Sequence, residues 1–362
     1  MRVKLEDVCE RGSSNLKQSD VVELKGDYPV YGASGCIGSV DFYHQENSYV
    51  AVVKDGAGIG RTTLHPAKSS VIGTMQYLLP KNNVLPEYLY YVVSYMHLEK
   101  YFTGATIPHI YFKDYKNEKF NLDSVDTQKQ VVDVLGKCEA VIESRKRELQ
   151  LLDNLIKARF VEMFGDPLSN PMRWRETILR TVCSKITDGE HGSVPRVEIG
   201  HPFLNAKHVL KNGLIDWASV SFTDDEVHEK LCRRCSPEKN DILMTTTGTI
   251  GNIAIVPDME SFSMDRGITL LKLDYELVDS VFIACMLRFD GIQALMQSNV
   301  HASAIGHLFL NKVEQIPIIL PPLDMQRQFA DFVRQVDKSK FVKQKVRIRT
   351  INSSSINAVI RI

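Results

Sequence analysis

Residues Asp126–Phe164 read DTQKQVVDVLGKCEAVIESRKRELQLLDNLIKARFVEMF, with no proline and a single glycine, Gly136. Apolar residues recur along this segment in alternating steps of four and three, and the series is interrupted by Arg145 and Arg159. The spacing predicts one long helix with a heptad seam, ~58 Å long at 1.5 Å per residue. Because isolated helices are marginally stable, this seam needs a partner.

A second copy of this segment begins 198 residues later. Ile107-Pro108-His109 aligns with Ile305-Gly306-His307, and Asp126-Thr127-Gln128 aligns with Asp324-Met325-Gln326. In both copies a strand and a short turn precede the helix, and we expect the aspartate to be its N-cap. Gly165-Asp166-Pro167 is expected to end the first helix.

Weaker matches extend the repeat upstream. Gly58-Ile59-Gly60 resembles Thr249-Ile250-Gly251, and Leu5-x-x-Val8 resembles Leu179-x-x-Val182. A constant order with drifting offsets is typical of duplicated domains whose loops differ in length. Both halves also alternate short apolar runs with Gly and Pro signals, which indicates mixed α/β regions.

We therefore predict an α+β fold with a pseudo-twofold internal repeat. Two mixed α/β domains are expected to be separated by long antiparallel coiled-coil helices. The predicted segments are a first domain over 1–123, a central spacer helix over 124–166, a second domain over 167–322, a distal spacer helix over 323–349 and an irregular tail over 350–362.

The distal helix departs from the central one. By the offset of 198 its seam turns polar at Lys340, so we expect a shortened or altered distal helix. A hypothesis that follows is self-association through an exposed stripe of the central helix, or a requirement for a partner helix. The predicted helix or partner interface comprises Leu135, Ile142, Leu149, Leu152, Ile156, Phe160, Met163, Val333 and Val336.

Composition excludes several classes of protein. The 362 residues carry 44 Lys+Arg and 44 Asp+Glu, and a hydrophobic content of 44% excludes overall disorder. No N-terminal signal peptide is evident, and no apolar run approaches the ~20 residues that span a bilayer. The seven dispersed cysteines fit a reducing cytoplasm better than a disulfide scaffold. We expect a cytoplasmic protein without membrane contact.

The order of several short motifs resembles the specificity (S) subunit of type I restriction–modification systems over nearly the whole chain. Each motif is weak alone, but their order and duplication are specific. They are Tyr28-Pro29-Val30-Tyr31-Gly32, Lys54-Asp55-Gly56-Ala57-Gly58-Ile59-Gly60, Asp188-Gly189-Glu190-His191-Gly192, Pro202-Phe203-Leu204, Gly213-Leu214-Ile215-Asp216, Asp241–Gly251 and Phe160–Gly165, together with the two helix openings.

The resemblance implies a subunit that performs no chemistry. Two target-recognition domains each contact one half of a bipartite, asymmetric site on double-stranded DNA, and helix length sets the gap between the halves. Two modification (methyltransferase) subunits and the restriction (motor/nuclease) subunits are the implied partners. No cofactor is expected on this chain, whereas S-adenosylmethionine, ATP and Mg²⁺ are expected in the partners. With 3.4 Å per base pair, ~58 Å corresponds to roughly 17 base pairs as an upper bound on the separation.

Candidate DNA contacts come from basic and hydroxyl side chains around the two glycine-containing loops and the repeated histidines, because such groups bind phosphates and base edges. For the loops, the sequence leaves open a purely conformational need for glycine. For the histidines, it favours a capping or buried role. The candidates are Lys54, Arg61, Thr62, Thr63, His109, Lys113, Lys207, His208, Thr245, Thr246, Thr247, Arg266, His307 and Lys312.

Three alternatives remain open from the residues alone. A stand-alone DNA methyltransferase would need an [Asp/Asn/Ser]-Pro-Pro-[Tyr/Phe] loop, and Leu320-Pro321-Pro322-Leu323 does not fit it. A metal nuclease would need clustered acids with a lysine, for which Glu23-Leu24-Lys25 alone is thin. A coiled-coil interaction scaffold is the third.

One motif could suggest a metal site. His228-x₃-Cys232-x₂-Cys235 lacks the second cysteine pair usual in structural zinc sites, so no metal is expected.

Overall fold

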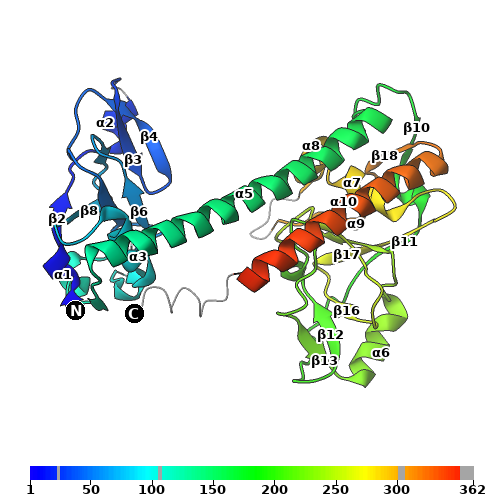
Figure 1. Cartoon of the computed structure of the whole chain (residues 1–362). Helices are drawn as coiled ribbons and strands as arrows, with labels where there is room; N and C mark the ends of the chain where they lie inside the picture. The colour runs from blue at the N-terminus through cyan, green and yellow to red at the C-terminus, as the bar shows by residue number, and fades with distance from the viewer. Residues whose placement is uncertain (23–24, 105–107, 301–305, 351–362) are drawn as a thin grey trace. The chain divides into compact units, whose positions relative to one another are not determined.

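The computed structural model describes residues 1–22, 25–104, 108–300 and 306–350, with side chains described as far as Lys340. The expectations for Ile107, Ile305 and the tail 351–362 therefore lie outside the described residues. The chain divides into two compact units, and we call Met1–Arg145 unit 1 and Lys146–Gln344 unit 2. Helix α5 (Val125–Phe164) is 40 residues long and continues from one unit into the other (Figure 1).

Unit 1 contains two small sheets and a separate ladder. An antiparallel sheet has the order β2 (Cys9–Ser13), β8 (Met75–Pro80), β5 (Tyr49–Val53), β6 (Thr62–His65). A second sheet has the order β4 (Gly35–Val40), β3 (Tyr28–Gly32), β7 (Ser70–Val71), with β3 and β7 parallel. The ladder pairs β1 (Arg2–Lys4) with β9 (Lys119–Asn121). The helices are α1 (Leu5–Val8), α2 (Gln18–Val22), α3 (Pro86–Tyr95) and α4 (Phe112–Tyr115).

Unit 2 repeats this arrangement strand for strand. Its antiparallel sheet has the order β11 (Cys183–Asp188), β17 (Ile268–Leu273), β14 (Ile242–Thr245), β15 (Ile253–Ile255). Its second sheet has the order β13 (Ser221–Thr223), β12 (His201–Leu204), β16 (Ser263–Met264), again with one parallel pair. The ladder pairs β10 (Arg175–Ile178) with β18 (Pro317–Leu320). The helices are α6 (Asp225–Arg234), α7 (Ser280–Leu287), α8 (Asp290–Ser298) and α9 (Leu310–Glu314).

The common strand orders confirm the predicted internal repeat and the α+β fold. The weak upstream sequence match also marks equivalent positions in the two units. Leu5 and Val8 in α1, and Leu179 and Val182 in the 3₁₀ helix Leu179–Val182, are all fully buried just before the first strand of each four-stranded sheet. A β-bulge between Cys183 and Lys185 accounts for one residue of the drift in offset.

The two ends of α5 belong to two different hydrophobic cores. Val131 and Leu135 are buried in the core of unit 1, whereas Phe160 and Phe164 are buried in the core of unit 2. The helix ends as predicted before Gly165, whose φ of +77° leaves the helical region. Part of the predicted seam is therefore domain core rather than a free-standing coil.

The helix α10 (Leu323–Thr350) contacts the unit 2 part of α5. The ring centroids of Phe160 and Phe329 lie 5.4 Å apart, and Lys340 pairs with Asp153 at 2.7 Å. The partner number on α10 falls as the α5 number rises, so the two helices run antiparallel, as predicted. Although burial opposes the charge, hydrogen bonds to Asp153 and Asp337 raise the pKa of Lys340. The polar seam position is thus occupied by an ion pair.

The residues of the predicted interface fall into distinct environments. Leu135 lies in the unit 1 core, and Phe160 and Val333 lie in the unit 2 core. Ile156 and Met163 pack against the unit 2 core, and Val336 is buried. Ile142, Leu149 and Leu152 are half-buried. Within the described residues, no helix has both the length and the apolar character that crossing a bilayer requires.

A buried glutamine joins each long helix to its own domain. The Gln128 Oε1 accepts a hydrogen bond from the N–H of Leu85, the N-cap of α3, and its Nε2 donates to the carbonyls of Asn83 and Asp123. Leu85 and Asn83, which precede α3, are thereby hydrogen-bonded to the first turn of α5.

Gln326 makes the same three contacts in unit 2. Its Oε1 accepts from the N–H of Asp279, the N-cap of α7, and its Nε2 donates to the carbonyls of Leu277 and Pro321. Both glutamines are fully buried. The N-cap expectation for Asp126 was wrong, because α5 begins at Val125 and the Ser124 hydroxyl accepts the Thr127 N–H. Asp324 likewise lies inside the first turn of α10.

Replacing Gln128 by leucine is expected to destabilise unit 1 by about 2–4 kcal/mol, because three hydrogen bonds are lost and their backbone partners stay partly buried. Gln326→Leu should do the same to unit 2. Denaturant unfolding and amide exchange in the first turns of α3 and α7 measure the effect. The exposed Gln130 and Gln328 provide matched leucine controls. If the control variants lost as much free energy of unfolding as the Gln128 and Gln326 variants, the stabilising role assigned to the two buried glutamines would be wrong.

The core of unit 1 should also make its stability depend on pH. His65 is buried, its ring centroid lies 4.4 Å from that of Tyr31 and 5.3 Å from that of Tyr49, and burial lowers its pKa to about 4. The unfolded chain, with a histidine pKa of ~6.5, therefore binds the proton first, and stability falls as the pH drops from ~6.5 towards about 4, by on the order of 3 kcal/mol.

His65→Phe is expected to flatten this part of the stability–pH curve, as measured by thermal unfolding between pH 4 and pH 7. The exposed His97, which has a positive φ, can be replaced by asparagine as the control. An unchanged slope in the His65 variant would show that other groups cause the loss.

Candidate nucleic-acid interface

Equivalent loops follow β5 in unit 1 and β14 in unit 2, which are inner strands of the two four-stranded sheets. In unit 1 the Gly56 N–H donates to the Pro108 carbonyl, and the Gly60 N–H donates back to Val53. In unit 2 the Gly248 N–H donates to the Gly306 carbonyl, and the Gly251 N–H donates back to Thr245. Gly56, Gly58, Gly60, Gly248 and Gly251 have φ between +73° and +101°. The glycines therefore satisfy a conformational need, which was the alternative left open by the sequence.

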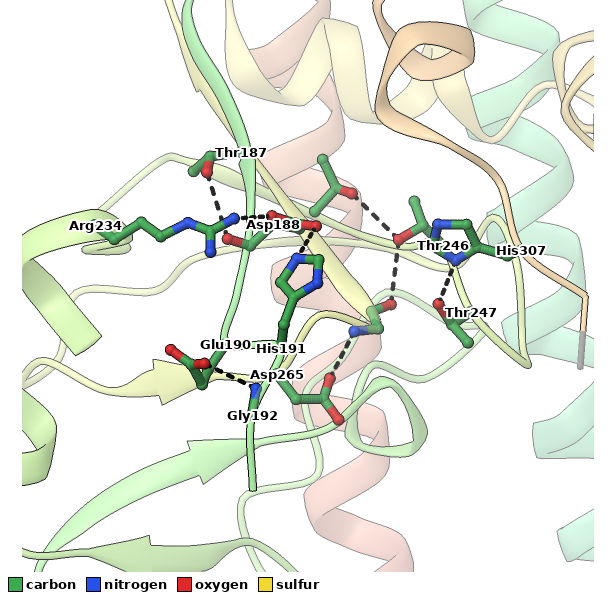
Figure 2. Close-up of polar contacts among 12 residues, drawn as sticks. Thr187, Asp188, Glu190, His191, Gly192, Arg234, Thr246, Thr247, Asp265 and His307 are labelled. Carbon is green, nitrogen blue, oxygen red and sulfur yellow. Dashed lines mark hydrogen bonds and ion pairs between the residues drawn. The ribbon is translucent and has the colours of Figure 1, made fainter. Parts of the chain in front are cut away.

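Each loop also holds one of the repeated histidines. His109 Nδ1 lies 2.7 Å from the Asp55 carboxylate. In unit 2, His307 Nδ1 lies 2.7 Å from the Thr247 hydroxyl, as Figure 2 shows. Backbone bridges join the same pairs of residues. The histidines are half-buried, so each has an internal partner while part of its ring reaches solvent. Both units thus hold a histidine against this loop, but the side chain that contacts the histidine is a carboxylate in unit 1 and a hydroxyl in unit 2.

The other unit 1 candidates surround this loop or lie beyond it. Lys54 lies 3.8 Å from Asp55, and the exposed Arg61 donates to the Ala33 carbonyl. The hydroxyls of Thr62 and Thr63 donate to backbone carbonyls. Lys113 is exposed, with its ammonium 5.3 Å from the centroid of the Tyr111 ring.

Three unit 2 candidates have internal roles instead of a surface position. Thr245 Oγ1 accepts the Asn252 N–H, and Thr246 Oγ1 bonds the Thr269 hydroxyl. His208 accepts the Asn205 N–H, and burial, with Lys207 beside it, lowers its pKa. All three side chains are almost completely buried, so the structure does not offer them to a ligand. The remaining candidates are Thr247, which is half-buried, and Lys207, Arg266 and Lys312, which are exposed.

A cluster that was not among the predicted contacts lies at the end of β11. The buried Asp188 carboxylate accepts from Arg234 Nη2 at 2.6 Å and contacts His191 Nε2 at 2.7 Å (Figure 2). The string Asp188–His191 stood out in the sequence. Arg234, 46 residues further on, carried no signal that linked it to this string.

The possible zinc ligands are used differently. Both ring nitrogens of His228 bond serine hydroxyls, Ser263 at 2.7 Å and Ser261 at 2.8 Å, and Cys235 lies in a hydrophobic core. In the described part of the chain, no group of three or more His, Cys, Asp or Glu side chains is arranged to hold a metal ion.

Known proteins share both the sequence pattern and the fold. A family model described as type I restriction modification DNA specificity domain matches residues 1–154 and 194–350. The MjaIX specificity subunit of Methanocaldococcus jannaschii is 22% identical in an alignment of 294 residues that covers 74% of this chain and 66% of the relative. The EcoBI specificity subunit of Escherichia coli is 20% identical in an alignment of 259 residues that covers 65% of this chain and 54% of the relative. The chain thus spans slightly less than two thirds of the first relative and about half of the second.

Two solved structures resemble the chain in fold. The crystal structure of a type I restriction–modification S subunit from M. genitalium gives a TM-score of 0.60 at 16% identity, covering 99% of this chain and 94% of that one. A chain from a study of complex assembly in the type I system gives 0.51 at 14% identity, covering 100% and 96%. With the family model matching most of its residues, the chain belongs to the type I restriction modification DNA specificity domain family, that of the specificity subunits of type I restriction–modification systems.

Proposed function

We propose that this chain recognises a bipartite, asymmetric target on double-stranded DNA, with one half contacted by each unit. The observation that supports the proposal is the duplicated loop-and-histidine arrangement, which the chain carries once in each unit. Two similar contacts on one chain also raise affinity through effective concentration. The contacting groups that we propose are Lys54, Arg61, Thr62, Thr63, His109 and Lys113 in unit 1, and Lys207, Thr247, Arg266, His307 and Lys312 in unit 2.

The asymmetry of the target follows from the difference between the loops. An ionised Asp55 only accepts hydrogen bonds, so it favours a proton on His109 Nδ1. The Thr247 hydroxyl both donates and accepts, so it leaves His307 either tautomer. Since donor and acceptor patterns distinguish base pairs in the major groove, the two units should select different sequences.

The spacing between the two half-sites is proposed to depend on α5. Its 40 residues correspond to ~60 Å of helix. Insertion or deletion of helical residues in the middle of α5 would therefore change the gap, and not the bases, that the protein selects.

We propose that the methylation and restriction reactions are carried out by partner subunits and not by this chain. Two modification subunits would use S-adenosylmethionine to methylate adenine, and restriction subunits would use ATP and Mg²⁺. A surface for a helical partner is available on α5, where Leu151 and Leu155 are 61% and 46% exposed. Self-association through the spacer helices is the other use of that surface. Such an assembly would act in the cytoplasm, where free cysteines persist.

The proposal is tested by selection from a random duplex library with the full chain bound to its modification subunits, followed by methylation mapping in cells. We expect two short specific elements separated by a gap of arbitrary sequence. An uninterrupted motif, or no enrichment over random DNA, would refute the proposal.

Substitutions in one loop should affect only one half-site. His109→Ala is expected to weaken discrimination in one half by about tenfold, and His307→Ala in the other, because each removes one base-side contact. Competition binding against single-position variants of the selected site measures this. Lys81 and Lys239 lie at the opposite ends of the two sheets and serve as alanine controls. An equal loss of base discrimination in both half-sites would contradict the proposal that each unit contacts its own half-site.

A further inference from the structure

The cluster at Asp188 combines a buried acid with an accessible guanidinium and an accessible imidazole. The side chain of Asp188 is 12% exposed, whereas those of Arg234 and His191 are 53% and 51% exposed. Arg234 comes from the last turn of α6, and His191 comes from the loop after β11. Within the described residues, the Arg234 side chain makes no other hydrogen bond. One carboxylate therefore holds two side chains that are each about half exposed (Figure 2).

The loop that carries His191 is itself held in place. The Glu190 N–H donates to the Met264 carbonyl, and the Arg266 N–H donates to the Glu190 carbonyl. A Cβ on Gly189 would lie 2.2 Å from the Met264 carbonyl oxygen, so only glycine permits this approach. The position of His191 is thus set by backbone contacts as well as by Asp188.

The sheet register places this cluster beside the loop of unit 2. Asp188 is opposite Thr269 in β17, and Thr269 is opposite Met244 in β14, which ends at Thr245. The two strand ends are separated by two strand spacings, or about 10 Å. At 3.4 Å per base pair, that is roughly three base pairs. One duplex can therefore reach both the cluster and the Thr247–His307 pair.

Unit 1 folds into the same sheets without this cluster. Ser13, opposite Gln76, occupies the position of Asp188. Residues 41–48, which connect β4 to β5, contain no helix that corresponds to α6. Since the same topology forms without either part, the cluster is not a requirement of the fold. A feature confined to one unit is suited to distinguishing the two half-sites.

We propose that Arg234 and His191 form a second DNA contact of unit 2 that reads base edges in its half-site, and that Asp188 is the positioning residue that holds both. The proposal rests on the DNA-recognition function above. A guanidinium fixed on one side by a carboxylate keeps donors for acceptor atoms such as those of guanine in the major groove. Ordering it before binding removes part of the entropic cost of the contact.

The test compares the wild-type complex with Arg234→Ala, Arg234→Lys, His191→Ala and Asp188→Asn in library selection and competition binding. Arg234→Ala should weaken binding to the selected site about tenfold and make one or two positions of the unit 2 half-site degenerate. Arg234→Lys should keep the salt dependence but lose the same base preference, because lysine lacks the planar fork. His191→Ala should relax positions in the same half-site. Arg233→Ala, at the exposed neighbouring residue, is the matched control.

Asp188→Asn should relax the same positions as Arg234→Ala and His191→Ala, and should add nothing to Arg234→Ala at the positions that Arg234 reads. A residue with a merely structural role would lower the unfolding temperature without changing base preference. If Asp188→Asn does not fold, the Arg234→Lys variant tests the proposal, because it keeps a positive charge beside Asp188 and so should fold.

Two results would overturn the inference. One is unchanged base preference in folded Arg234→Ala or Asp188→Asn. The other is an equal loss on selected and random DNA, which would reduce the cluster to a phosphate contact. Failure of the wild-type complex to select any bipartite site would instead refute the proposed function, so the two failures are distinguishable.

Discussion

The organisation of this protein depends on a single helix that contributes side chains to two hydrophobic cores. Val131 and Leu135 are removed from water in unit 1, and Phe160 and Phe164 are removed from water in unit 2. Propensity alone does not stabilise the intervening turns, which are largely exposed, so they depend on the anchored ends and on α10. A change within either core is therefore also a change at one end of α5.

Comparison of the two units separates the hydrogen bonds that both share from the side chains that differ between them. Gln128 and Gln326 make the same three hydrogen bonds, and both glycine loops close with the same backbone contacts. By contrast, Asp55 is replaced by Thr247 beside the histidine, and Ser13 by Asp188 at the end of the first sheet strand. The identical contacts fix the backbone, where the long helices meet the domains and in the glycine loops, whereas the side chains that differ lie at the end of the sheet that carries the candidate contacts.

The sequence predicted the features that depend on local pattern. The apolar spacing of 126–164 and the offset between Gln128 and Gln326 indicated the long helix and the duplication, because periodicity and repetition are visible in the chain itself. Burial was harder to predict. Thr246 and His208 have the chemistry of a contact, but both are buried, Thr246 just after β14 and His208 in the 3₁₀ helix Ala206–His208. Arg234 carried no local signal, since only folding brings it to Asp188. The N-cap at Ser124 instead of Asp126 illustrates how uncertain helix ends are.

The two-stranded ladders have a consequence for how such genes can change. β1 pairs with β9, and β10 pairs with β18, so the first and last strands of each unit lie side by side. A unit therefore behaves as an insert whose two chain ends meet at one junction. Exchange of the coding segment between those ends would preserve the opposite unit, provided that the new segment packs against the residues of α5 and α10 that complete its core. Recombination at such a junction would replace the loops of one unit while keeping the strand order of the chain.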